Sequence, residues 1–150
     1  MLRIVRTDST HQDFKDLVQL LDADLAIRDG DDHEFYHQFN SIDSLKEVVV
    51  IYDGLTAVGC GAIKFFDKYA VEVKRMFTLP EARGKGVATR ALVELEEWAK
   101  ELGYKKCVLE TGVNQPEAIA LYRKRGYLQT PNYDQYAAME ASLCFEKILK

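Results

Sequence analysis

A strand-like segment that runs into a glycine-rich basic stretch and then into a helical pattern constrains this chain most. Residues 71–78 (VEVKRMFT) have the alternation and β-branched content of a strand, and residues 87–102 carry an apolar stripe at helical spacing. Between them, residues 83–86 read Arg-Gly-Lys-Gly. A helix N-terminus attracts anions through its free N–H groups and dipole, and glycine lets an anion approach the backbone closely. The segment therefore predicts a site for a phosphorylated ligand.

The composition and charge of the chain limit the kind of protein that holds this segment. Its 150 residues, 47% of them hydrophobic, are enough for one domain with a core, and we expect a single domain over residues 1–150. The formal net charge of -4 argues against a nucleic-acid partner, which would favour a basic excess. No apolar stretch is long enough to cross a bilayer and no targeting signal is visible, so we expect no membrane partner.

The cysteines indicate the redox environment. Cys60, Cys107 and Cys144 lie in apolar runs, their number is odd, and their spacing does not fit a metal site. This pattern favours reduced, buried thiols, and we therefore expect a cytoplasmic protein.

Periodic patterns along the rest of the chain predict a sheet with helices against its faces. Strands are expected at residues 2–6, 46–52, 56–66, 71–78, 105–111 and 142–148, and helices at residues 10–27, 87–102 and 116–126. We expect Ser9 or Thr10 to cap the first helix, residues 53–54 (Asp-Gly) to form a hairpin turn, Pro116 to begin a helix, and Gly103 to end one. Early hairpins followed by a strand-helix-strand crossover imply a mixed sheet.

Three glycine-rich patterns compete for the phosphate site. A P-loop is rejected, because residues 84–86 (Gly-Lys-Gly) place no hydroxyl after the lysine. A dinucleotide fingerprint would need glycine where Thr89 stands and would begin nearer the strand, so it stays as a weaker alternative. The third pattern, Arg/Gln-x-x-Gly-x-Gly/Ala, is matched in full by Arg83, Gly86 and Ala88.

On these residues the sequence resembles the GNAT-type acyl-CoA N-acyltransferases. Residues 71–92 (VEVKRMFTLPEARGKGVATRAL) look like that family's strand, pyrophosphate loop and helix, and residues 110–127 (ETGVNQPEAIALYRKRGY) look like its later strand-helix segment. The likeness covers roughly residues 47–127 and is closest to small bacterial members with small-molecule acceptors. It implies an α/β (α+β) fold with a mixed, largely antiparallel central sheet of about seven strands flanked by helices.

The resemblance also implies how acetyl-CoA would bind. The fourth and fifth strands would splay apart, and the pantetheine arm would lie between them. The residues implied for the cofactor are Met76, Phe77 and Thr78 on the strand, Arg83, Gly84, Lys85, Gly86, Val87, Ala88 and Thr89 around the pyrophosphate, and Asn114, Ala118 and Tyr122 on the later segment. Asn114 is equally typical of a turn or cap before Pro116.

Acetyl transfer to an amine needs a base, because alkyl amines with a pKa of about 10.4 are mostly protonated at neutral pH. Glu72 is the first candidate, since a glutamate on this strand often has that role in the family, and Glu110 on the next strand is the second. Water as the base is the third possibility. The alternative for Glu72 is an ion pair with a neighbouring Lys or Arg. A backbone N–H near Phe77 is the implied donor to the developing oxyanion.

Tyr122 corresponds to the family's usual general acid, which protonates the departing thiolate. The alternative is a tyrosine that only packs beside Ala118 and Ile119. Without the family pattern, packing would be the default interpretation.

Two sequence motifs lie before the strand expected at residues 46–52, one resembling a zinc site and one rich in acidic residues. Residues 33–37 (HEFYH) match the zinc pattern H-E-x-x-H, but they follow a turn-like stretch and lack the longer metzincin pattern, so we expect no metal. Residues 22–34 contain six acids and one arginine. This segment either helps to wall an acceptor site that favours a cationic amine, or forms a solvated acidic loop.

Together with the resemblance, these patterns predict an acetyl-CoA-dependent N-acetyltransferase that acts on a primary amine of a small-molecule or amino-acid-like acceptor, with no metal. Partners would be that acceptor, no nucleic acid and no membrane, with a homodimer left open. The alternatives are a non-catalytic acyl-CoA-binding module, a protein N-acetyltransferase, and a dinucleotide-dependent oxidoreductase.

Overall fold

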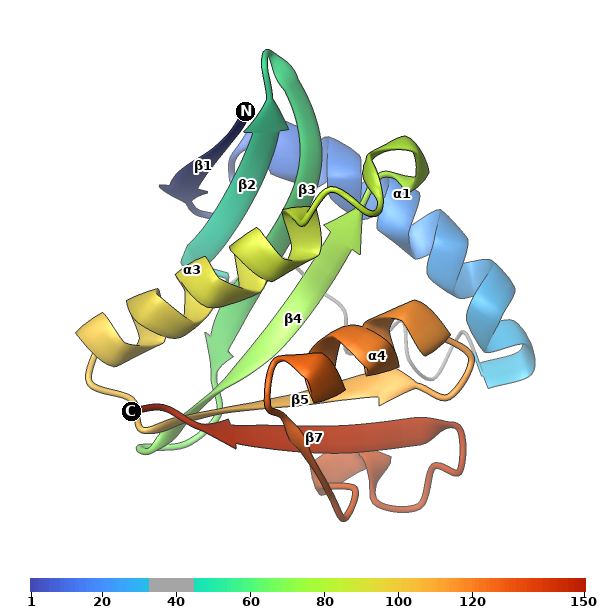
Figure 1. Ribbon diagram of the computed structural model, residues 1–150. Helices are drawn as coiled ribbons and strands as arrows, with labels where there is room; N and C mark the ends of the chain where they lie inside the picture. The colour runs from blue at the N-terminus through green and yellow to red at the C-terminus, as the bar shows by residue number, and fades with distance from the viewer. Residues whose placement is uncertain (33–44) are drawn as a thin grey trace.

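A seven-stranded sheet forms the middle of the molecule, with helices on both of its faces (Figure 1). The computed structural model describes residues 1–32 and 45–150. The strands are β1 (Leu2–Thr7), β2 (Glu47–Asp53), β3 (Thr56–Phe65), β4 (Ala70–Thr78), β5 (Lys106–Gly112), β6 (Leu128–Thr130) and β7 (Ser142–Ile148). The α-helices are α1 (Gln12–Asp29), α3 (Val87–Glu101) and α4 (Pro116–Lys124), with 3-10 turns at η1 (Gly30–Asp32), η2 (Pro80–Ala82) and η3 (Asp134–Tyr136).

The sheet has the strand order β1-β2-β3-β4-β5-β7-β6, and each neighbouring pair is antiparallel except β4 with β5. This arrangement confirms the mixed, largely antiparallel sheet. Most expected elements also agree with the structure to within about two residues: Pro116 begins α4, and Gly54 and Gly103 have the positive φ values expected of turn and helix-stop glycines. The strand β6 was not expected, because three residues are too few to show a period.

The predicted cap of α1 was wrong. His11 caps this helix, with its Nδ1 accepting a hydrogen bond from the Asp13 N–H at 3.2 Å. Ser9 and Thr10 precede the cap position, and the Thr10 N–H and hydroxyl both donate to the Asp8 carboxylate. The helix therefore begins slightly later than a serine or threonine cap would place it.

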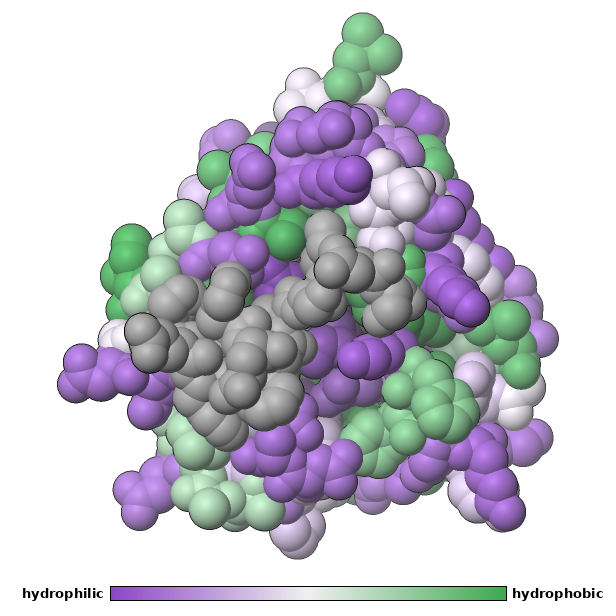
Figure 2. All heavy atoms as spheres, turned by 180° about the vertical axis from the view of Figure 1, so that it is seen from behind, coloured by the Kyte–Doolittle hydropathy of each residue, from purple (hydrophilic) through white to green (hydrophobic). Residues whose placement is uncertain are grey.

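Each face of the sheet has its own apolar core. On one face, Leu92 and Leu95 of α3 are fully buried in a cluster that also contains Tyr122 of α4. On the other face, Phe14 and Leu17 of α1 pack against residues of β2 and β3. The surface seen from behind is mainly hydrophilic, with separate hydrophobic patches (Figure 2). The helices thus turn apolar stripes inward and leave charged residues outside.

Among the described strands, β4 and β5 form the one parallel pair, and this pair opens like a fork. The strands β4 and β5 pair over three positions, from Ala70 with Lys106 to Glu72 with Val108. Beyond these positions both strands continue without pairing to each other, to Thr78 and Gly112 respectively. The predicted separation of the fourth and fifth strands is therefore confirmed, and unpaired backbone lines the opening.

A β-bulge lies in β4 beside this opening. Cys60 of β3 is opposite Phe77 and Ala62 is opposite Lys74, so two residues of β4 face Gly61 alone. One of the two, Arg75, has a left-handed φ of 58°. A bulge leaves an extra residue unpaired and bends the strand locally.

Two further sequence expectations concern helices and thiols. Among residues 1–32 and 45–150, no helix is both long and apolar enough to span a membrane. The three cysteines are buried and free, as the sequence predicted.

Candidate active site

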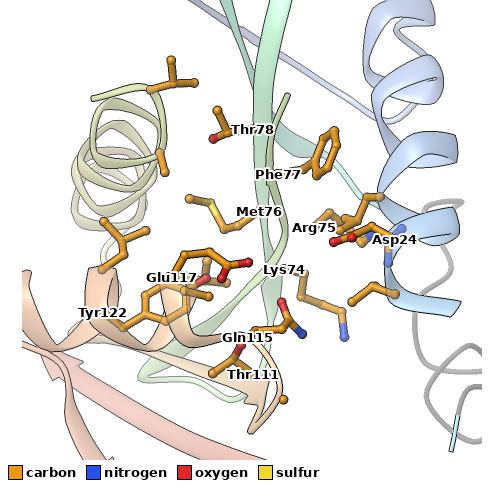
Figure 3. Close-up of a pocket in the computed structure, with 18 of the residues that line it drawn as sticks. Asp24, Lys74, Arg75, Met76, Phe77, Thr78, Thr111, Gln115, Glu117 and Tyr122 are labelled. Carbon is orange, nitrogen blue, oxygen red and sulfur yellow. The ribbon is translucent and has the colours of Figure 1, made fainter. Parts of the chain in front are cut away.

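A pocket of about 380 Å³ opens where β4 and β5 separate. Figure 3 shows β4 in its middle, with α4 on one side and α1 on the other. The lining comes from α1 (21, 24, 25 and 29), β4 (72–78), the loop and first turn of α3 (82–84 and 86–89), β5 (110–112), α4 with its N-cap residue (115, 117, 118, 121 and 122) and Tyr136 of η3. Residues far apart in the sequence therefore meet in one cavity.

The glycine loop forms one end of the pocket. Gly84 and Gly86 both have a φ of 80°, and a Cβ added at either residue would meet no atom within 4 Å. Gly86 is the N-cap residue of α3, and in the described part of the chain no side chain forms a cap hydrogen bond there. The N-terminus of α3 is therefore uncapped by the described residues, and open space lies in front of the glycines.

The pocket-facing end of β4 also has unsatisfied polar atoms. The Thr78 Oγ1 is buried and has no hydrogen-bond partner among the described residues. The Arg75 side chain is almost fully buried and forms an ion pair with Asp22 of α1, and this contact holds the bulge against the α1 side of the sheet. A buried hydroxyl without a partner is uncommon in proteins and is consistent with a ligand that completes it.

Two carboxylates lie at the other end of the pocket. The first is Glu72, whose Oε2 accepts a hydrogen bond from the Tyr133 hydroxyl at 2.6 Å. Its Oε1 lies 3.5 Å from the Lys74 Nζ. The side chains of Glu72 and Lys74 are only 10% and 8% exposed. Both oxygens of Glu72 thus face donors of the protein.

The second carboxylate is Glu110 on β5. Burial raises the pKa of Glu110 from 4.5 to about 7, and the nearby charges of Asp29 and Glu72 act in the same direction. A hydrogen bond from the Ser142 hydroxyl and the charge of Lys74 oppose this rise. A carboxylate with a pKa near 7 can both accept and release a proton at neutral pH.

Tyr122 lies on the α4 side of the pocket (Figure 3). Its ring is 6% exposed and contacts Tyr127 edge to face, with 5.7 Å between the ring centroids. Burial raises the pKa of Tyr122 above its usual value of 10, and the Glu110 charge adds to the rise. The phenol is therefore protonated at neutral pH and can act as a proton donor.

The structure brings together most of the residues predicted for the site. Glu72, Met76, Phe77, Thr78, Arg83, Gly84, Gly86, Val87, Ala88, Thr89, Ala118 and Tyr122 all line the pocket. Lys85 and Asn114 do not line it, although Lys85 lies between the two loop glycines. The Asn114 side chain instead donates to the Arg28 carbonyl at 3.2 Å.

Sequence reasoning missed three residues around the end of the pocket that holds Glu72 and Glu110. Tyr133 binds Glu72, and Tyr136 lines the pocket. Arg28 connects α1 to the start of α4 through ion pairs with Asp24, at 3.0 Å, and with Glu117. The two tyrosines lie in a segment without a helical or strand period, so only the folded chain reveals their position.

The zinc-like residues 33–37 lie outside the described residues. In the described part of the chain, no group of three or more His, Cys, Asp or Glu side chains is arranged to hold a metal ion.

Comparisons with known proteins extend these observations. The sequence profile of the acetyltransferase (GNAT) family matches residues 14–127. The IAA acetyltransferase of Azospirillum brasilense is 43% identical over 95 residues, which cover 63% of this chain and 62% of that protein. The uncharacterized N-acetyltransferase YjgM of Escherichia coli is 38% identical over 81 residues, which cover 53% of this chain and 48% of that protein. The matches thus span about half to three fifths of these relatives.

Solved structures share the whole fold. A Klebsiella pneumoniae protein assigned as an acyl-CoA N-acyltransferase superimposes with a TM-score of 0.84 and 28% identity, over 100% of this chain and 99% of that chain. A GNAT family acetyltransferase from Elizabethkingia anophelis with acetyl-CoA bound has a TM-score of 0.71 at 20% identity, over 99% of this chain and 98% of that chain. The profile match and the shared fold show that this chain belongs to the acetyltransferase (GNAT) family.

Proposed function

We propose that this protein is an acetyl-CoA-dependent N-acetyltransferase that acts on a primary amine of a small molecule. One observation carries the proposal: a single pocket joins an uncapped helix N-terminus, suited to an anion, to two carboxylates, one buried and one partly buried, suited to a cationic amine. Membership of the acetyltransferase (GNAT) family supports the same reaction. The buried free cysteines are consistent with the cytoplasmic location that we expect.

The residues of the pocket fit acetyl-CoA, which would supply the acetyl group as a thioester. The open space in front of Gly84 and Gly86 would admit a pyrophosphate to the N–H groups of α3, with Arg83 as an added cation. The unpaired edge of β4 and the Thr78 hydroxyl offer hydrogen bonds to a polar chain in the cleft. Met76, also lining the cleft, supplies apolar contact.

The two faces of the sheet support separate roles for the proton donors and acceptors. Tyr122 lies on the α4 side of β4, whereas Lys74 lies on the α1 side (Figure 3). Glu72 shares the strand face of Lys74 by alternation. An amine approaching from the α1 side would therefore meet carboxylates, while the departing sulfur would meet the phenol of Tyr122.

Charge supports an amine as the acceptor. Asp24, Asp29, Glu72, Glu110 and Glu117 line the pocket, against three lining cations. One of these cations, Arg75, is paired with Asp22, and two of the acids, Asp24 and Glu117, are paired with Arg28. Asp22 and Arg28 both lie outside the lining, and including both leaves the same excess of two acids. An excess of carboxylates raises the local concentration of cations and would favour an ammonium group over an anionic acceptor.

The test is release of free thiol from acetyl-CoA in the presence of tyramine, 1,4-diaminobutane, lysine or a peptide with a free N-terminus. We expect release with at least one of the three small amines and less with the peptide. Tight binding of acetyl-CoA without any release would identify a non-catalytic acyl-CoA-binding module. Preferential release with the peptide would identify a protein acetyltransferase, and preferential binding of a nicotinamide dinucleotide would identify an oxidoreductase.

A further inference from the structure

We infer that Glu110 takes the proton from the acceptor amine, and that Glu72 is a positioning residue which, with Lys74 and Tyr133, fixes the charge around it. This inference rests on the proposed N-acetyltransferase function. It reverses the order of the two carboxylates that the sequence favours.

The first argument is the register of the forked strands. Glu72 lies opposite Val108 at the last paired position of β4 and β5. Glu110 is two residues further along β5, on the same strand face as Val108, where the strands no longer pair. Glu72 is therefore at the closed base of the fork, and Glu110 lies within its opening, where a substrate amine has room.

The second argument is that Glu72 is already engaged. Tyr133 donates to one oxygen at 2.6 Å, and the Lys74 ammonium faces the other at 3.5 Å. To take a proton from an amine, Glu72 would have to give up one of these contacts in a site that is 90% shielded from water. The contacts instead suit a carboxylate that is held in place by its two donors.

The third argument is the surroundings of Glu110, which disfavour a permanent charge. The groups that face its carboxylate are Asp29 of α1, Glu72 and Lys74 of β4, Tyr122 of α4, Tyr136 of η3, and Ser142 and Cys144 of β7. Two of them are acids and one is a cation, and Glu110 is itself partly buried, which is the largest cause of its raised pKa. The resulting pKa of about 7 suits a base that works at neutral pH.

The proposed step is a single proton transfer. One N–H bond of the ammonium breaks, its electron pair stays on nitrogen, and an O–H bond forms on Glu110. The neutral amine then forms the C–N bond with the acetyl carbon as the C–S bond breaks and its electron pair goes to sulfur. The sulfur takes a proton from Tyr122, the phenol recovers one from the second N–H through solvent, and Glu110 releases its proton to water. The net reaction releases one proton for each acetyl group transferred.

Carbon NMR of the side-chain carboxyl groups tests the charge arrangement without any substrate. The Glu110 signal is identified by its loss in Glu110→Gln, and we expect it to titrate near pH 7. Removal of the like charge in Glu72→Gln should lower this midpoint, and removal of the cation in Lys74→Met should raise it, each by about one pH unit. Glu97→Gln on the outer part of α3 is the matched control and should leave it unchanged. A Glu110 midpoint near 4.5, or one that Glu72→Gln does not move, would overturn the inference.

The pH dependence of kcat/KM tests the catalytic assignment, with acetyl-CoA and whichever of tyramine, 1,4-diaminobutane and lysine reacts fastest. Glu110→Gln should lower kcat/KM by roughly 10²–10⁴-fold and remove the acidic limb of the profile. Glu72→Gln should keep that limb, displaced about one pH unit to lower pH. Circular dichroism and melting temperatures establish that both variants are folded.

The two possible failures differ. A wild-type protein that releases no thiol with any of the three amines would overturn the proposed function and this inference with it. Thiol release at wild-type rates by Glu110→Gln, or loss of the acidic limb in Glu72→Gln alone, would overturn only the assignment of Glu110.

Discussion

The two ends of the pocket are built in different ways. The loop end is contiguous in sequence, since residues 83–89 supply the glycines and the first turn of α3, and its chemistry is mainly that of the backbone. The carboxylate end is assembled from four strands or helices and from the segment that contains Tyr133, which lies 61 positions after its partner Glu72. Its chemistry belongs to side chains.

This difference has a physical consequence. Backbone N–H groups do not titrate, so an anion site at a helix N-terminus depends mainly on geometry and on small residues that leave it open. Carboxylates change charge with their surroundings, so the same glutamate can be a fixed charge or a base according to what folds against it. We therefore expect changes at the loop end to alter binding, and changes at the carboxylate end to alter pH dependence and turnover.

The largest effect is expected for Gly86→Val. Valine would fill the open space in front of the loop and would be strained at a φ of 80°. We expect calorimetry to show affinity for acetyl-CoA reduced by roughly 100-fold or more, which corresponds to about 3 kcal/mol. Gly103→Val is the matched control, because Gly103 also has a positive φ, of 92°, and open space but lies outside the pocket. Unchanged affinity in a folded Gly86→Val protein would contradict a loop site made by the backbone.

The next largest effect is expected at the carboxylate end of the pocket, where Glu110 should make the free energy of unfolding depend on pH. The pKa of Glu110 is about 7 in the folded protein against 4.5 ordinarily, so between these values the folded state binds more protons than the unfolded state. This carboxyl group therefore lowers the free energy of unfolding as the pH rises from about 4.5 to 7, by about 3 kcal/mol in total. Denaturant unfolding should show that Glu110→Gln gains stability relative to wild type across this window. If the difference in free energy of unfolding between wild type and Glu110→Gln stayed constant from pH 4.5 to 7, Glu110 would have an ordinary pKa.

The loop end could be predicted from the sequence because its signals are local. Arg83, Gly86 and Ala88 stand at fixed spacing between a strand and a helix, and each residue has a direct physical use there. The succession of strands and helices along the chain followed from periodic patterns, whereas the fork was expected only from the family resemblance. The short strand β6 was not predicted, because three residues show no period. The cap at His11 was not predicted either, because histidine is an unusual N-cap residue.

The carboxylate end could be predicted only in part. Glu72 and Glu110 were both candidates, but their order depends on Tyr133, Lys74 and Ser142, whose proximity arises from strand register and loop path. No local pattern specifies that a tyrosine from a loop after β6 will reach a glutamate of β4. The charge state of a buried group is a property of the fold, and this is why the sequence left the base open.

A smaller effect is expected for Tyr122→Phe. Tyr122 lies between the two ends of the pocket. This change removes the phenolic proton donor and keeps the ring contacts with Tyr127 and Phe145. We expect kcat to fall roughly 10-fold, about 1.4 kcal/mol, with near-normal affinity for acetyl-CoA, because the missing interaction develops as the thiolate departs. Tyr104→Phe, in a partly buried tyrosine outside the pocket, is the control. An unchanged kcat under conditions where chemistry limits turnover would assign Tyr122 to packing alone.

The smallest effect, and the most direct test of the contrast between the two ends, is expected for Glu117→Gln. Glu117 lines the pocket on α4, pairs with Arg28 of the α1 wall, and lies close enough to Arg83 of the loop for that charge to lower the pKa of Glu117. Its negative charge should thus attract a cationic acceptor and oppose a pyrophosphate. Because the side chain is 48% exposed, we expect the KM for 1,4-diaminobutane to rise only about 3-fold, in line with the small energies of exposed ion pairs.

The matched control for this change is Glu94→Gln, which breaks an Arg–Glu pair of similar exposure between Arg6 and α3, away from the pocket. It should alter neither KM. In Glu117→Gln the KM for acetyl-CoA should stay equal or fall slightly, because the change removes a negative charge near the anion site. Parallel increases in both KM values would mean that Glu117 only braces α1 against α4 through Arg28. Opposite movements of the two KM values would instead show that one side chain influences a cation site and an anion site at the same time, and that the two ends of the pocket differ in the sign of the charge that they bind.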